Sequence, residues 1–460
     1  MVKDKRPNIL MIMADQFRLN TLEGMGDEIP TPNIRRIMDK GMVFTQASCT
    51  CPLCTPSRAS LATGRYPSRC GVTVHDAVLP VKQATYYQAM RKAGYRVAIA
   101  GKSDLHKADK YCGTEGDLPS LYQYGFTDPF ETEGKMNCAW ISYNEDGSKR
   151  MQGPYQKYLE ERGLLERLNA DYKSYMREKP RYYAAPSVLP SEDFQDEFIG
   201  RAANKWLLEV EDDVPWHYFV SFVGPHNPWD PPAEDYNTFA QANFPPAIED
   251  DFEKKPQWVK RRAGNQTGGM TQDQLQNVKR CYAASVQVID RWVGQLLDTL
   301  EERSLAQNTV VIFCADHGEL LGDHGLLEKK AMYETSVRIP LVVHTPWMEQ
   351  RQDSTVLAQL MDLAPTCLDF ANISWDEKEM DAKSLLPFLQ PDPSSKSHHP
   401  VQISELLNCQ MVYDGRYKWI RNWNDIDELY DLEQDPHELH NIIEQHPEII
   451  TRLQAYTFRQ

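Results

Sequence analysis

The sequence lacks any apolar run that approaches the roughly 20 residues a transmembrane helix needs, so no membrane association is predicted. It also lacks a signal-peptide cleavage pattern. The positive charges of residues 1–6 precede an apolar run at residues 8–14, which is interpreted as a strand. We therefore expect a cytoplasmic protein, or a periplasmic or secreted one if a signal was removed before this numbering begins.

An excess of positive charge is missing as well, and this argues against nucleic acid as a partner. The 460 residues hold 50 Lys and Arg against 66 Asp and Glu, for a net charge of −16. Such a surface repels phosphate backbones at long range, although a local basic pocket can still hold a small anion. No internal repeat is present. Ten cysteines are spread along a chain long enough to fold without disulfides.

Short apolar runs recur along the chain with helical segments between them, at residues 8–14, 96–100, 217–223, 309–314 and 341–344. Continuous apolar runs of this length are typical of strands buried on both faces. The apolar stripe of residues 271–300 predicts one long helix. We therefore expect an α/β fold with a large, mixed, mostly parallel sheet sandwiched by helices.

A second unit is predicted at the C-terminus, beyond a Pro/Ser-rich stretch at residues 387–400. Short strand patterns follow at residues 411–413, 416–420 and 428–432, with Asp414-Gly415 as a hairpin turn and a final helix near Pro447. The division predicted from these signals is a catalytic α/β domain at 1–386 and a small α+β subdomain with a short antiparallel sheet at 387–460.

Polar residues follow four of the predicted strands. They are Asp15 and Gln16, Lys102 and Asp104, His226, and Asp316 with His317. The carboxyl ends of parallel strands share one sheet edge, where ligands bind, so these residues are expected to converge. A single acidic residue at a strand end is more often a helix cap. The coincidence of four such ends is what indicates a site.

The sharpest local signal is the segment Leu53-Cys54-Thr55-Pro56-Ser57-Arg58. Pro56 suits the first turn of a helix, which puts Cys54 at a helix N-terminus where negative charge is favoured. Arg58, one turn on, can reach back to an anion. This environment suits a nucleophile that attacks an anionic ester. One alternative is a thioredoxin-like Cys-x-x-Cys pair of Cys51 and Cys54. Another is a zinc site formed from Cys49, Cys51, Cys54 and Cys70, and a third is a plain buried structural cysteine.

This segment resembles the sulfatase signature in which the cysteine is oxidised to formylglycine. Further resemblances occur in the same order along the chain, at residues 31–34, 60–67, 316–325, 333–340 and 428–436. The chain is thereby identified as a member of the formylglycine-dependent sulfatases of the alkaline phosphatase superfamily. Residues 112–195 and 227–270 match no pattern and are expected to shape the substrate pocket. They offer stacking candidates for a sugar: Tyr122, Trp140, Tyr143, Tyr155 and Tyr158.

The resemblance implies one divalent metal held by Asp15, Asp316, His317 and the modified Cys54. Gln16 falls where many sulfatases have a second aspartate, and its amide oxygen is a further candidate ligand. Oxygen ligands favour calcium, while the histidine leaves manganese open. A formylglycine-generating enzyme is the implied partner for maturation, and the oligomeric state stays open.

The resemblance also assigns the groups that handle charge and protons. Arg58, Lys102 and Lys329 would neutralise the sulfate and the nucleophile, and His226 would protonate the leaving oxygen. His75 is expected to face the substrate. The family typically has Gly-Lys-x-His, but this chain has Asp104 at the histidine position. His106 comes two residues later, so both remain candidates for the base that releases sulfate.

The implied reaction is hydrolysis of a sulfate ester to an alcohol and inorganic sulfate. A hydroxyl of the hydrated formylglycine attacks sulfur, and its second hydroxyl provides the route by which sulfate is expelled. A carbohydrate sulfate is the first expectation, with small alkyl or aryl sulfates as others. Two alternative functions are a phosphonate monoester or phosphodiester hydrolase with the same nucleophile, and an inactive homologue that binds sulfated glycans.

Overall fold

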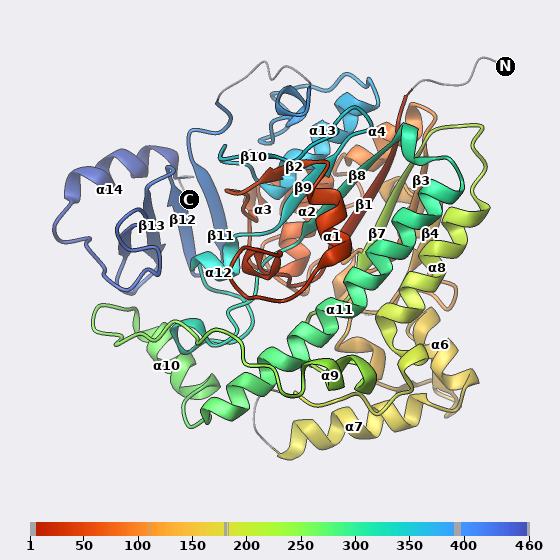
Figure 1. Ribbon diagram of the computed structural model, residues 1–460, viewed down its shortest axis with the longest axis horizontal. Helices are drawn as coiled ribbons and strands as arrows, with labels where there is room; N and C mark the ends of the chain where they lie inside the picture. The colour runs from red at the N-terminus through yellow and green to blue at the C-terminus, as the bar shows by residue number, and fades with distance from the viewer. Residues whose placement is uncertain (1–5, 110, 179–181, 183, 391–396, 458–460) are drawn as a thin grey trace.

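The computed structural model describes residues 6–109, 111–178, 182, 184–390 and 397–457, and it contains two main sheets (Figure 1). Part of the predicted linker, residues 391–396, lies outside the described residues. The expected fold class is confirmed. The first part of the chain forms a large sheet between helical layers, and the last part forms a small antiparallel sheet.

The large sheet has eight strands in the order β10-β2-β9-β8-β1-β7-β3-β4. Their bounds are β1 (Asn8–Ala14), β2 (Met42–Phe44), β3 (Arg96–Gly101), β4 (Asp128–Glu131), β7 (Trp216–Phe222), β8 (Thr309–Ala315), β9 (Leu341–His344) and β10 (Gln352–Ser354). All neighbours from β8 to β4 run parallel, whereas β9 is antiparallel to both β8 and β2. Every residue of β1, β7 and β8 is buried, as expected for strands covered on both faces.

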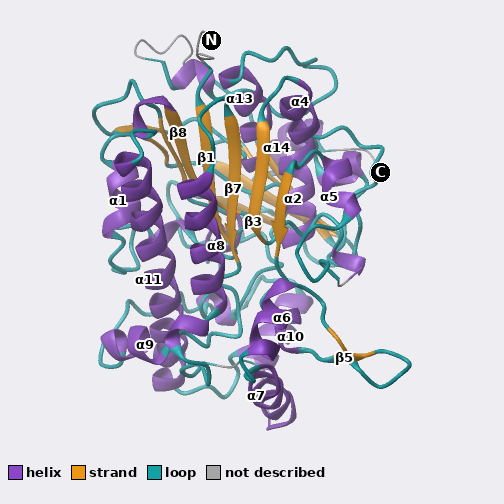
Figure 2. Cartoon of the chain, turned by 90° about the vertical axis from the view of Figure 1, so that its right-hand side faces the viewer, coloured by secondary structure: helices purple, strands orange, loops and turns teal. Residues whose placement is uncertain are grey.

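Helices form a layer on each face of this sheet (Figures 1 and 2). One layer holds α1 (Pro32–Met38), α8 (Gln195–Glu209) and α11 (Gln272–Glu302); the other holds α2 (Cys54–Thr63), α4 (Tyr86–Lys92) and α13 (Leu363–Phe370). The predicted long helix is α11. It begins with a capping box in which Thr271 Oγ1 accepts from Gln274 N at 3.2 Å. None of the described helices is long and apolar enough to cross a membrane.

The remaining elements lie in the insertions and connections. They are α3 (Pro67–Cys70), α5 (Pro119–Tyr124), β5 (Ser142–Tyr143), β6 (Lys149–Arg150), α6 (Pro154–Glu161), α7 (Leu165–Glu178), α9 (Ala233–Phe239), α10 (Gln257–Gln266) and α12 (Glu334–Val337). One stacking candidate is corrected here. Tyr155 is 1% exposed and packs in the apolar core of the first insertion, so it is no sugar platform. Tyr143, by contrast, is 64% exposed.

The C-terminal sheet has four antiparallel strands (Figure 1). They are β11 (Gln402–Leu406), β12 (Cys409–Tyr413), β13 (Tyr417–Asn422) and β14 (Glu428–Asp431), followed by α14 (Pro447–Leu453). The sequence did not predict β11, because its polar and apolar residues form no strong strand pattern. The apolar cluster under this sheet also contains Tyr66 and Met361 from the first part of the chain, so both parts share a packed interface.

A buried carboxylate joins the large sheet's helical layer to the segment that enters the C-terminal sheet. Asp362, just before α13, accepts from Gln359 N at 2.8 Å and Lys383 N at 2.9 Å. His398 and His399 contact the same carboxylate through Nε2, at 3.0 and 2.9 Å. Burial alone would raise the pKa of Asp362, but the two histidines hold it well below its usual range.

We predict that Asp362→Ala lowers the free energy of unfolding by about 3–5 kcal/mol, because it leaves buried donors without their acceptor. The measurement is the denaturant midpoint with the m-value. The matched control is Asp353→Ala, which removes a half-exposed carboxylate paired with Arg351 and should cost no more than about 1 kcal/mol. Equal losses in the two variants would contradict this role of Asp362.

Candidate active site

The four central strands are adjacent in the order β8-β1-β7-β3, and all run parallel. They are the four strands whose C-terminal residues were predicted to converge. Asp15 follows β1, Lys102 follows β3 and Asp316 follows β8. Ligand atoms of Asp15, Cys54, Asp316 and His317 lie within 4.8 Å of one another, and all four residues are buried. The edge therefore holds one compact cluster of ionisable side chains.

Cys54 stands at the N-terminal end of the ten-residue helix α2, with Leu53 as the N-cap residue. Its Sγ is 3.2 Å from His317 Nε2 and 3.7 Å from Asp15 Oδ1. Burial alone would raise the pKa of the Cys54 thiol, but the positive charges of Lys102 and Lys329 bring it well below its ordinary value. The site therefore stabilises negative charge at position 54.

Arg58 lies one turn further along α2 and is 2% exposed. Its Nε donates to Asp316 Oδ2 at 2.8 Å, and its Nη2 approaches Asp15 Oδ2 at 3.4 Å. Its Nη1 donates to the carbonyl of Lys102 and to the hydroxyl of Ser221, both at 2.7 Å. The guanidinium thus contacts the ends of all four central strands. Ser221 was not among the residues predicted from the sequence.

The four-residue cluster has the donor set that a divalent cation needs. Asp316 Oδ1 is oriented by the backbone amides of Gln16 at 3.0 Å and His317 at 2.9 Å. His317 Nδ1 is 3.0 Å from the carbonyl of Gly318, which holds its proton there and turns the Nε2 lone pair toward Cys54. Two carboxylates and one imidazole fit calcium or manganese better than a soft, thiolate-bound metal.

The Gln16 side chain makes hydrogen bonds with three neighbouring side chains. Its amide oxygen accepts from Lys329 Nζ, and its amide nitrogen donates to Glu319 and Asn227. One lone pair of that oxygen is engaged by Lys329, and the ligand role of Gln16 stays a prediction. Neither Glu319 nor Asn227 was singled out from the sequence, although both lie within stretches that were.

His226 and Lys329 contact each other, and both act on the Cys54 side chain. Lys329 Nζ donates to His226 Nε2, and His226 Nδ1 contacts the carbonyl of Asn227. Burial and the charge of Lys329 lower the pKa of His226. Lys329 therefore disfavours the protonated form of the His226 imidazole until an anionic group enters the site.

The two candidates for the base separate clearly. Asp104 is buried, and its carboxylate lies within 4.8 Å of Cys54 and of His75. His106 instead points to Glu131, which it contacts through Nε2. Its imidazole is therefore engaged away from position 54. The reason is the backbone of Asp104, whose φ of 56° turns the chain between the two residues.

The zinc alternative is wrong for the described part of the chain. Cys49, Cys51 and Cys70 join no cluster of metal-ligating atoms there, and all three are buried and unpaired. Burial raises the pKa of the Cys51 thiol well above its ordinary value, which keeps it protonated. Cys54 therefore stands apart chemically from its neighbouring cysteines.

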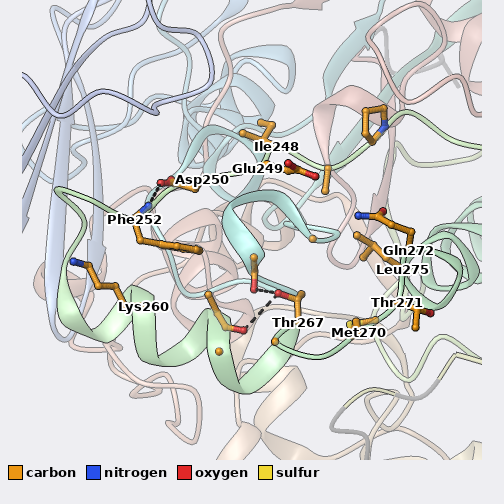
Figure 3. Close-up of a pocket in the computed structure, with 17 residues that line it drawn as sticks. Ile248, Glu249, Asp250, Phe252, Lys260, Thr267, Met270, Thr271, Gln272 and Leu275 are labelled. Atoms are coloured by element: carbon orange, nitrogen blue, oxygen red, sulfur yellow. Dashed lines mark hydrogen bonds between the residues drawn. The ribbon is translucent and has the colours of Figure 1, made fainter.

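A cavity of about 610 Å³ opens beside the loop that carries Asp323 (Figure 3). It is formed by the second insertion, the end of α10 and the start of α11, with Ile248, Phe252 and Leu275 among its walls. No residue assigned to the site above lines it. The second insertion therefore shapes a hollow of its own in addition to covering the loop that follows β8.

The family profile described as Sulfatase matches residues 7–373. A second profile, N-sulphoglucosamine sulphohydrolase, C-terminal, matches residues 322–457. The chain is 28% identical to a choline-sulfatase of Rhizobium meliloti (strain 1021), over 95% of this chain and 83% of the relative. These matches cover both sheets.

Two solved structures share the fold. A phosphonate monoester hydrolase of Agrobacterium radiobacter has a TM-score of 0.78 at 21% identity, covering 98% of this chain and 94% of that one. A structure in complex with its substrate D-glucosamine-2-N,6-O-disulfate has a TM-score of 0.74 at 21% identity, with 98% and 96% covered. The chain belongs to the sulfatase family. It is a sulfuric ester hydrolase, and its family implies a formylglycine and a divalent metal.

The His106–Glu131 pair predicts a pH-dependent contribution to stability. Burial alone would lower the pKa of His106, but the neighbouring Glu131 carboxylate raises it. The pKa reaches about 9, against an ordinary value of 6.5. A raised pKa stabilises the fold fully below pH 6.5, and this contribution is lost as the pH rises through 9. His106→Gln should therefore cost on the order of 3 kcal/mol more at pH 6 than at pH 10.

This difference is measured from denaturant midpoints of both proteins across that range. His440→Gln is the control, because the His440 side chain is 79% exposed. A His106→Gln penalty that stays constant with pH would contradict the ion pair.

Proposed function

We propose that this chain hydrolyses the sulfate ester of a sugar, with a nucleophile formed from Cys54. The observation that carries the proposal is the position of Cys54 itself. It stands at the start of α2, within 4.8 Å of three groups suited to a divalent cation, and beside the charges of Lys102 and Lys329. A structural cysteine would need none of these neighbours.

The proposed metal ligands are Asp15, Asp316, His317 and the side chain at position 54, with calcium favoured over manganese. When present, the formylglycine and the metal together supply an oxygen nucleophile in place of the thiol. Maturation would require a formylglycine-generating enzyme. The donor set described above fits this cofactor pair, since Asp15 and His317 both face position 54.

The chain's own cations bind the substrate. The charges of Lys102 and Lys329 both act on position 54, and Arg58 contacts both aspartates. Fixed positive charge in a buried site stabilises the charge that gathers on the sulfuryl oxygens. His226, held by Lys329, is the proposed donor of a proton to the leaving oxygen.

The substrate class rests on relatives. A sulfated glucosamine is the ligand of one structural neighbour, and an N-sulphoglucosamine sulphohydrolase profile matches the C-terminal part. The choline-sulfatase relative favours a small cationic alkyl sulfate as the second candidate. We further propose that residues 1–386 form the catalytic domain and residues 387–460 a subdomain that packs against it.

The first experiment tests the nucleophile. After coexpression with a formylglycine-generating enzyme, the peptide carrying Cys54 should lose about 18 Da, because the thiol side chain becomes an aldehyde. Converted protein should release sulfate from an aryl sulfate only with a divalent cation, and Cys54→Ala should lose this activity. Cys51→Ala is the matched control and should retain it. Metal-loaded, converted protein without turnover would instead support the glycan-binding alternative.

The second experiment compares leaving groups and ester types. We expect kcat/KM for glucosamine 6-sulfate to exceed that for choline sulfate and for an aryl phosphonate monoester by at least about tenfold, a difference of roughly 1.4 kcal/mol in transition-state binding. A preference for the phosphonate would favour the phosphonate hydrolase alternative. A preference for choline sulfate would contradict the sugar assignment and leave the sulfatase mechanism intact.

A further inference from the structure

Two side chains beside the nucleophile, those of His75 and Asp104, are not explained together by the roles assigned so far. A nitrogen of His75 and a carboxylate oxygen of Asp104 lie within 4.8 Å of each other and of Cys54 Sγ. His75 comes from the loop after α3, and Asp104 from the turn after β3. Cys54 and Asp104 are buried, whereas the His75 side chain is 35% exposed. His75 is therefore the member of this group that reaches both position 54 and solvent.

Asp104 is poorly suited to accept a proton. Its Oδ2 is 3.0 Å from Lys102 Nζ, and its Oδ1 is 2.9 Å from Lys107 Nζ. A carboxylate with an ammonium group on each oxygen is a weak base. The same pairing argues against a second metal ion in this group, because both carboxylate oxygens are already engaged.

The other imidazoles near position 54 are also engaged. His317 Nε2 faces the metal cluster, and Nε2 of His226 accepts from Lys329. His75 differs from both. Its Nδ1 is 3.1 Å from Asp76 Oδ1, which holds the ring proton on that nitrogen. Its Nε2 has no protein partner among the described residues, so it presents a lone pair.

We propose that His75, oriented by Asp76, is the general base of the step that releases inorganic sulfate, and that Asp104 stabilises its protonated form. Nε2 accepts one proton from a hydroxyl of the side chain at position 54. The electron pair of that O–H bond becomes the second bond of the restored carbonyl. The carbon–oxygen bond to the sulfate breaks with its electrons on the departing sulfate. The proton then passes from the exposed imidazole to water.

This inference rests on the proposed function, and it explains how the chain works with an aspartate at position 104. The His75 imidazole approaches the nucleophile from a different loop. The Asp104 carboxylate serves as the negative partner of the protonated His75 ring. One carboxylate, Asp76, orients the base, and a second, Asp104, offsets the positive charge that the base gains with the proton. A ring nitrogen of His75 lies within 4.8 Å of the reacting side chain, whereas Asp76 acts through His75 and is a positioning residue.

The test uses full-length converted enzyme, with conversion confirmed on the Cys54 peptide, and an aryl sulfate whose alcohol is followed optically. In His75→Ala we expect kcat to fall by about 10²–10⁴-fold, the usual contribution of a general base. The kcat/KM for alcohol release should stay within a few-fold of the parent value, because it reports only the steps up to that release. Intact enzyme quenched during turnover should be heavier by about 80 Da than the hydrated form, and by about 98 Da than the aldehyde form, because it retains the sulfate ester.

Two further variants sharpen the result. Asp76→Asn should show the same pattern more weakly, since it removes only the orienting charge. His440→Ala, at an exposed position of the C-terminal part, should leave both constants and the quenched mass unchanged. Melting temperatures of all variants establish that the fold is intact.

The proposal is overturned if kcat and kcat/KM of His75→Ala fall together without the added mass, which would assign His75 to the first step. An unchanged kcat would overturn it as well. Failure of the proposed function looks different, because converted parent enzyme would then release no alcohol at all.

Discussion

The buried guanidinium of Arg58 is the interaction on which the rest of the site depends. It bonds to Asp316 after β8, approaches Asp15 after β1, and donates to Ser221 in β7 and to the carbonyl of Lys102 after β3. One side chain thus links the carboxyl ends of four strands that are far apart in sequence. Only the planar, five-donor fork of arginine can satisfy these acceptors together, and lysine could not replace it.

The same interaction explains why charge can gather at a buried edge. Asp15 and Asp316 would repel each other there, and each would carry a large desolvation cost. Arg58 compensates both, while Lys102 adds a second pair with Asp15. Removing the guanidinium would leave Asp316 without its cationic partner and Asp15 with Lys102 alone, with an expected cost of about 3–5 kcal/mol. The structural and electrostatic parts of its role are therefore inseparable, and lost turnover in an Arg58 variant would not by itself reveal a catalytic contact.

The sequence predicted the parts of this arrangement that are local. Apolar runs identified the four central strands, and the Leu53–Arg58 segment placed Cys54 at a helix start. Contacts between residues far apart in the chain could not be predicted from the sequence. The antiparallel direction of β9, the strand β11 and the pairing of His106 with Glu131 each depend on segments that meet only in the folded chain. The hydrogen bond from Lys329, over 300 residues away, to the amide oxygen of Gln16 is another such pairing.

Backbone conformation at the strand ends accounts for the rest. Gln16 and Asp104 have φ values of 65° and 56°, in the left-handed region that residues with a side chain seldom adopt. Gly101 has a φ of 99°, and a Cβ there would overlap the carbonyl of Ser221. The turns at Gln16 and Asp104 each cost of order 1–3 kcal/mol, whereas glycine adopts such a φ without strain, and all three lie directly beside the charged cluster. At Asp104 the turn sends the carboxylate toward Cys54 and His106 away from it, so strain in one residue decides which histidine can act. The base must then come from elsewhere, and among the imidazoles near Cys54, His75 is the one whose Nε2 has no protein partner among the described residues.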